Sequence, residues 1–113
     1  MITKEEFRGV ATVTARILGR AKQLEGDTPK RAQRWIIHND GDISVSFVVK
    51  ESSDGTTYAN AAAGALTVPA KSSRLQEVYL AGASTHFAAY ASTASGESAV
   101  RANLETLETP GIL

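Results

Sequence analysis

Two Asp-Gly pairs, Asp40-Gly41 and Asp54-Gly55, separate short segments in which apolar and polar residues alternate. An Asp-Gly pair between alternating segments is a strong local signal for a β-hairpin, because a type I′ turn needs positive φ at both central residues. The alternation is clearest over residues 43–49, where every second residue is apolar. These features predict a small all-β protein, and 113 residues fit one domain.

Seven segments have the residue pattern of β-strands, with turn residues between them. They cover residues 7–21, 31–38, 43–50, 66–68, 75–80, 86–92 and 98–107. We expect the second and third segments to form a hairpin around Asp40-Gly41, and residues 59–64 to form a loop of small residues. About seven strands at this spacing predict an antiparallel β-sandwich, either jelly-roll or immunoglobulin-like.

The alternation also predicts which side chains fill the space between the two sheets. In the first segment, one face holds Phe7, Ala11, Val13, Ala15 and Ile17. For the centre of the core we expect one layer made of Trp35, Ile37, Val45, Phe47, Val78, Val100 and Leu104.

The two ends of the chain are predicted to flank the sandwich. Thr3 and Glu6 have the spacing of a capping box, which allows a short helical turn near the N-terminus. We therefore expect an N-terminal arm over residues 1–6, a β-sandwich domain over residues 7–107 and a C-terminal arm over residues 108–113.

The composition argues against several classes of protein. The chain has no cysteine, which excludes a disulfide framework and a thiolate zinc site. Its first residues are polar, and no apolar run reaches the ~20 residues that a membrane span needs. We therefore expect synthesis in the cytoplasm, no signal peptide and no membrane partner.

The charges are balanced in total but not along the chain. There are 12 basic and 12 acidic residues, yet residues 1–38 hold 8 bases and 4 acids (+4), and residues 39–113 hold 4 bases and 8 acids (−4). If the fold gathers the bases on one side, Arg16 and Arg20 are candidate partner contacts. The alternative is that these charges are scattered over a solvated surface.

No residue pattern in the chain is typical of catalysis or of cofactor binding. Both histidines, His38 and His86, lie at the ends of predicted strands, and we expect neither to bind a metal. No Gly-x-Ser-x-Gly motif and no phosphate-binding loop are present. Arg34 and Trp35 come nearest to a nucleic-acid site, but alternation places them on opposite faces. We expect no enzyme activity, no cofactor and no nucleic-acid partner.

Apolar residues near the two ends of the chain are the best candidates for contacts with a protein partner. Ile2 and Phe7 lie near the N-terminus, and Ile112 and Leu113 lie at the C-terminus after a Pro-Gly pair. An isolated domain would leave such side chains in water. Burial of one apolar side chain against a neighbour is worth roughly 1.5–3 kcal/mol before ordering costs.

Over residues 7–107 the layout resembles the small β-sandwich accessory proteins of tailed-phage virions, above all capsid decoration (cement) proteins. The segments that carry the resemblance are residues 9–15, residues 35–45, and residues 66–72 leading into residues 77–80. The resemblance implies a non-enzymatic protein on the capsid surface that clamps neighbouring major capsid subunits or other virion proteins. It also implies self-association, often as a trimer, and it carries over no binding residue.

A ligand- or carbohydrate-binding β-sandwich is the alternative function. Such modules usually present exposed aromatic side chains on a flat sheet face. Here the aromatic residues are few, and several of them are predicted to lie in the core. An enzyme ranks third, because no catalytic motif is present.

Overall fold

The computed structural model describes residues 2–17, 22–23, 31–81 and 83–107. These residues form nine strands and no helix, and seven of the strands have seven or more residues. The strands are β1 (Ile2–Ala11), β2 (Arg16–Ile17), β3 (Lys22–Gln23), β4 (Arg31–Asn39), β5 (Val45–Ser52), β6 (Ala59–Val68), β7 (Ser72–Leu80), β8 (His86–Ser92) and β9 (Ser98–Leu107).

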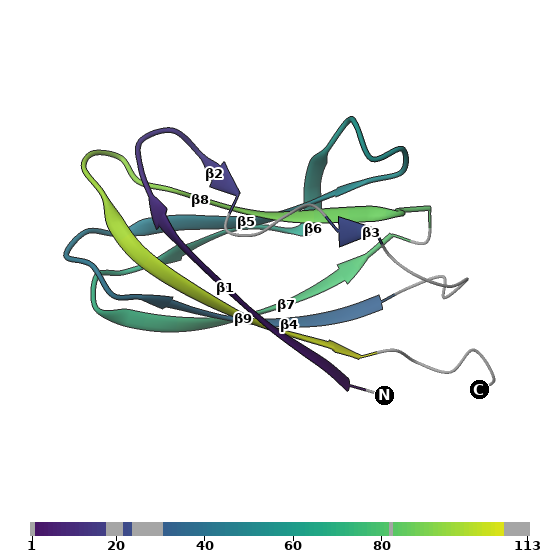
Figure 1. Ribbon diagram of the computed structural model, residues 1–113, viewed down its shortest axis with the longest axis horizontal. Coiled ribbons are helices and arrows are strands. Elements are labelled where there is room, and N and C mark those ends of the chain that lie inside the picture. The colour runs from purple at the N-terminus through teal and green to yellow at the C-terminus, as the bar shows by residue number, and fades with distance from the viewer. Residues whose placement is uncertain (1, 18–21, 24–30, 82, 108–113) are drawn as a thin grey trace.

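The strands form two antiparallel sheets that face each other (Figure 1). Sheet A has the order β1-β9-β4-β7, and sheet B has the order β2-β8-β5-β6. The short strand β3 also pairs with β8, so β2 and β3 lie one after the other along β8. The predicted antiparallel β-sandwich is confirmed.

The connections distinguish the two kinds of sandwich that the sequence left open. Along the chain, β1, β4, β7 and β9 belong to sheet A, and the other strands belong to sheet B. Only β5 and β6 are consecutive strands that pair directly; when β2 and β3 are counted as one strand, every other connection crosses from one sheet to the other. With β2 and β3 counted as one strand, this eight-strand order is a jelly roll.

The predicted core layer is confirmed. Each of its members is at most 1% exposed: Trp35, Ile37, Val45, Phe47, Val78, Val100 and Leu104. Small residues from β8 and β9 fill the gaps between these side chains, including Ala89, Ala91 and Ala102.

Trp35 lies at the centre of an aromatic cluster. Its ring centroid is 5.8 Å from that of Phe7, 5.4 Å from that of Phe47 and 6.4 Å from that of Phe87. The three phenylalanines of the chain thus join both sheets to one tryptophan, in stacked, tilted and edge-on arrangements. Its indole N–H donates to the Oε1 atom of buried Gln33 at 3.0 Å.

The hairpin predicted around Asp40-Gly41 is wrong. β4 pairs with β7 and β9 in sheet A, and β5 pairs with β6 and β8 in sheet B. Residues 40–44 are therefore a corner between the two sheets. Alternation shows only that Trp35 and Phe47 face inward. Two inward-facing strands can be neighbours in one sheet, or they can pack against each other across the core.

The N-terminal helical turn is also wrong, because the chain is extended from Ile2 onward. Residues 2–6, predicted as an arm, lie in β1 and pair with β9 from Ile2–Leu107 to Glu6–Asn103. Five of the ten register pairs between β1 and β9 fall in this segment, and this long-range pairing overrides a local helix-start signal.

Two further segments differ from the prediction. The strand expected over residues 7–21 ends at Ala11, and the chain then crosses to sheet B, which leaves Val13 63% exposed. Residues 59–64, expected as a loop, begin β6. The β5–β6 register shifts between Val48 and Lys50, so a bulge containing Gly64 (φ +71°) interrupts this strand.

Candidate protein-interaction face

The outer surface of sheet A, here called the A face, carries most of the described charged side chains that lie on a strand. Residues on its four strands alternate between the core and this surface, as the buried and exposed positions of β4 and β9 show. The A face consists of Lys4, Glu6, Arg8, Val10, Arg34, Ile36, His38, Ser73, Leu75, Glu77, Tyr79, Ala99, Arg101, Asn103 and Glu105.

One row across the A face alternates in charge. Lys4 on β1 pairs with Glu105 on β9, which pairs with Arg34 on β4, which pairs with Glu77 on β7. Opposite charges on directly opposed residues stabilise a sheet by roughly 0.2–1 kcal/mol per pair. Bases from the first third of the chain thus interleave with acids from the last two thirds, so these described charges are not segregated to one side.

A second row brings two like charges together. Arg8 lies opposite Arg101, and each guanidinium has its own carboxylate partner. The Nε atom of Arg8 is 3.2 Å from Glu6 Oε2, and the Nε atom of Arg101 is 2.8 Å from Asp40 Oδ2. The hydrogen bond from Arg101 lowers the pKa of the Asp40 carboxyl group. The ion pairs therefore offset the repulsion between the two arginines.

Two apolar side chains are exposed on β7. Leu75 is 53% exposed and Tyr79 is 58% exposed, and Ile36 is the register partner of Leu75 on β4. The Tyr79 hydroxyl donates to Glu77 Oε2 at 3.0 Å, and this hydrogen bond raises the pKa of Tyr79. Exposed apolar side chains bordered by charged ones are typical of protein-interaction sites.

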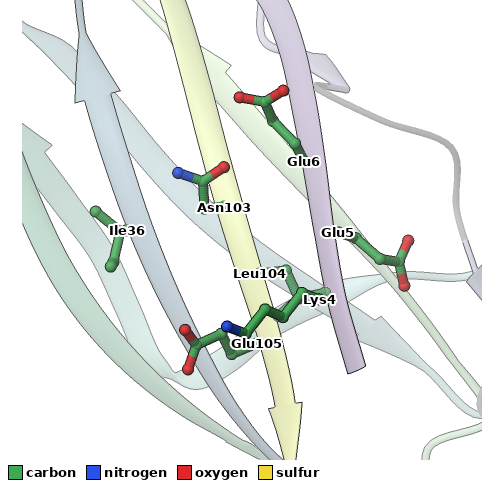
Figure 2. Close-up of a pocket in the computed structure, with 7 residues that line it drawn as sticks. All are labelled: Lys4, Glu5, Glu6, Ile36, Asn103, Leu104 and Glu105. Atoms are coloured by element: carbon green, nitrogen blue, oxygen red, sulfur yellow. The ribbon is translucent and has the colours of Figure 1, made fainter. Parts of the chain in front are cut away.

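An open depression of about 360 Å³ lies between β1 and β9 near this patch (Figure 2). In Figure 2 the Lys4 amine and the Glu105 carboxylate lie close together, while the Glu5 side chain points away from them. The lining residues are Lys4, Glu5, Glu6, Ile36, Asn103, Leu104 and Glu105. This mixed and charged lining suits a side chain of a protein partner better than an apolar small molecule.

His38 has partners on both ring nitrogens. Its Nδ1 atom is 2.6 Å from Ser73 Oγ, and its Nε2 atom is 3.3 Å from Asn103 Nδ2. Because the amide nitrogen can only donate, Nε2 accepts and Nδ1–H donates to the serine. The order serine, histidine, asparagine is that of a nucleophile, its base and an orienting residue, but the hydrogen bonds run in the opposite direction, because the histidine donates to the serine and accepts from the asparagine. In addition, His38 and Ser73 are register partners on β4 and β7, and Asn103 lies on β9 opposite Ile36, so the network lies on the outer surface of an open sheet, where water is not excluded.

Neither histidine belongs to a metal-binding cluster in the described part of the chain. No group of three or more His, Cys, Asp or Glu side chains with metal-binding geometry occurs there. The Nδ1 atom of His86 lies 2.8 Å from Thr85 Oγ1. The same residues contain no helix of the length and apolarity that a membrane crossing requires.

The residues predicted to contact a partner are only partly described. Ile2 begins β1, and Arg16 lies in β2 opposite Ala91. Phe7 is half-buried and stacks on Trp35, so its ring belongs to the edge of the core. The remaining three lie outside the described residues, namely Arg20, Ile112 and Leu113. A contact role for these six residues stays a prediction.

Leu75 and Tyr79 were not predicted as contact residues. Their signal was present in the sequence, because Val78 and Leu80 alternate with them and face the core. Apolar residues at the positions of a strand that alternate with its buried residues face outward, and so indicate an exposed apolar patch.

Comparisons with known proteins find similarity at the level of structure. A scan for protein families and a search of curated proteins give no match. A protein of the Bacillus endospore appendages, which form a family of disulfide-linked pili, is similar with a TM-score of 0.59 and 17% identity, over 97% of this chain and 88% of that one. The PBSX exported protein XepA is similar with a TM-score of 0.71 and 13% identity, over 98% of this chain but only 39% of that one. At these identities the chain shares with both proteins a fold.

Proposed function

We propose that this chain is a non-enzymatic structural subunit of a virion, and more narrowly a capsid decoration protein that binds neighbouring capsid subunits through the A face. The observation that carries the proposal is the exposed pair Leu75 and Tyr79 beside alternating charges on the outer face of sheet A. Exposure of such side chains to water is unfavourable, and their burial against a complementary protein surface is favourable.

Three further observations support this function. The jelly roll occurs in viral capsid domains, and the similar structures include a protein of pili, which are repeating protein assemblies. The Ser73–His38–Asn103 network lies on the open outer face of sheet A, which does not exclude water from a reacting group. The chain has no cysteine, so it would not form the disulfide links of such a pilus.

The test is binding of the purified protein to capsids that lack it, measured by co-sedimentation. We expect the double variant Leu75→Ser with Tyr79→Ser to bind at least about tenfold more weakly, because each buried apolar side chain is worth roughly 1.5–3 kcal/mol. Val13→Ser is the matched control, since Val13 is equally exposed but lies off the A face. Unchanged binding by a folded double variant would exclude the A face as the capsid contact.

The carbohydrate-binding alternative depends on one residue. Tyr79 is the aromatic side chain that the described residues expose most, whereas Trp35 is fully buried. A sugar platform usually needs aromatic rings side by side, and here the tyrosine hydroxyl is held by Glu77. A glycan screen in which the parental protein binds and Tyr79→Ala does not would favour this alternative over the capsid role.

A further inference from the structure

β1 is the long edge strand of sheet A, and its sequence fits a second copy of itself. Among the described residues it pairs with β9 on one side and with no strand of sheet A on the other. Figure 1 shows it at the margin of the sheet, in dark purple. An edge strand of ten residues is a template for pairing with another strand. Which strand β1 can pair with depends on which side chains would then lie directly opposite each other.

Two copies of β1 can pair antiparallel about a two-fold axis perpendicular to the sheet. The A faces of both copies then lie on the same side, and the residue on the axis sets the register. Near the middle of the strand the axis can pass through Glu5, Glu6, Phe7 or Arg8. Each choice opposes a different set of charges.

Three of these four registers oppose like charges directly. An axis at Glu5 or at Glu6 places that carboxylate against its own copy. The Glu5 register also opposes Lys4 to Glu6 twice, whereas the Glu6 register opposes Lys4 to Arg8 twice. An axis at Arg8 opposes two guanidinium groups. Like charges directly opposite each other destabilise a strand pair.

The register centred on Phe7 is the exception. It places Glu6 of one copy against Arg8 of the other, and does so twice because of the symmetry. In the single chain these two side chains already lie 3.2 Å apart and remain 43% and 69% exposed. The same register brings the two half-buried Phe7 rings side by side, and aromatic cross-strand pairs are favourable.

We propose that two copies of this chain join edge to edge through residues 4–10 of β1, centred on Phe7, so that their A sheets form one continuous eight-stranded sheet. Charged residues on an edge strand usually oppose pairing. Here the order of their signs favours one register and disfavours its neighbours. The proposal goes beyond the capsid role, because it holds whether or not the A face binds a capsid.

The test is the dimer dissociation constant of the full chain, measured by sedimentation velocity over a range of protein and salt concentrations. The parental protein should dimerise, and salt should weaken the dimer. Arg8→Glu and Glu6→Arg should each raise the dissociation constant about tenfold or more, since each opposes like charges twice. The double variant Glu6→Arg with Arg8→Glu should return it to within about threefold of the parental value.

The control is Glu77→Arg, a charge reversal on β7 at the other edge of the same sheet, which should leave the dimer unchanged. A monomeric parental protein, or a dimer that both single variants leave intact, overturns the proposal. Failure of the double variant to restore association, while it melts at the parental temperature, also overturns it. None of these outcomes alters the capsid-binding test, which uses Leu75 and Tyr79.

Discussion

The corner at residues 40–44 and the loop at residues 53–58 each contain an Asp-Gly pair and each follow a strand of eight or nine residues. The corner connects β4 in sheet A to β5 in sheet B, whereas the loop connects β5 to its direct neighbour β6. Positive φ among the described residues occurs at Gly55, but not at Asp40, Gly41 or Asp54. Neither pair therefore forms a type I′ turn.

The two regions differ in what holds them. In the corner, the side-chain amide of buried Asn39 donates to the carbonyl oxygens of Ile43 (2.7 Å) and Val68 (3.0 Å), and its Oδ1 atom accepts from the Gly41 N–H. In the loop, Asp54 Oδ1 accepts from the N–H groups of Thr56 and Thr57, which follow it in the sequence. The corner is thus held partly by a contact that is distant in sequence, with Val68, whereas the bonds of the loop lie within the loop itself.

The largest expected effect is at the corner. Asn39→Ala leaves the carbonyl oxygens of Ile43 and Val68 without this donor in the sandwich interior. We expect a loss of about 3–5 kcal/mol in the free energy of unfolding, since each unsatisfied buried group costs about 1–3 kcal/mol. Urea denaturation measures this. Asn60→Ala, at an exposed position of β6, is the control. An equal loss there would show that the hydrogen bonds of Asn39 do not give the corner special stability.

Gly41→Ala should have the next largest effect. A Cβ atom on Gly41 would lie 2.9 Å from the Cα atom of Ser98, so backbone of the corner or of β9 must move. Overpacking of this kind costs about 1–3 kcal/mol. Thermal and urea unfolding should both show the loss. If Gly41→Ala proves neutral, the corner is less tightly held against β9 than its geometry indicates.

Gly55→Ala tests the loop and should cost less, about 1–2 kcal/mol, because a side chain at φ +77° is strained. Its new Cβ would also lie 2.9 Å from the Cε1 atom of His86, whose ring can turn away. Gly64→Ala is the matched control, because Gly64 has φ +71° and open space around it. The difference between the two losses measures the His86 contact, and a loss above that of Gly41→Ala would reverse the ranking.

The smallest effect should be a pH dependence at Asp54. Backbone hydrogen bonds from Thr57 and Thr56 lower its pKa to about 2. A carboxyl group with a lowered pKa in the folded state stabilises the fold above its unfolded pKa of about 4, and this stability is lost as pH falls toward 2. Asp54→Asn should therefore reduce the fall in the urea midpoint of unfolding between pH 5 and pH 2. Added salt should leave this dependence largely unchanged, because the partners of Asp54 are backbone amides and the Ser52 hydroxyl rather than charged groups.

The comparison also explains which parts of the fold were predictable. Alternation identified the faces of the strands, so Phe47 and Trp35 were placed in the core, and the predicted bounds of β8 and β9 match the structure. Strand neighbours were not predictable. A strand whose apolar face points inward can pair with another such strand in the same sheet or pack against it from the opposite sheet. Asp40-Gly41 has the residues of a hairpin turn, but the long-range contacts of Asn39 determine its course.

The same limit applies to the candidate site. The outward orientation of Tyr79 follows from the inward orientation of Val78 and Leu80. The charge row does not follow from local pattern, since it requires β4 to lie between β9 and β7. Only then does Arg34 lie between Glu105 and Glu77.

The pairing of β1 with β9 also determines how this molecule would carry mechanical load. Ile2 lies opposite Leu107, so a pull through these two strand ends opens their ladder one pair at a time, from that end toward Ala11 and Ser98. A pull between Ile2 and the distant corner at residues 40–44 instead loads many ladder bonds of sheet A in parallel. A subunit under tension in an assembly would resist that tension far better when held along the sheet than when held by the adjacent ends of β1 and β9.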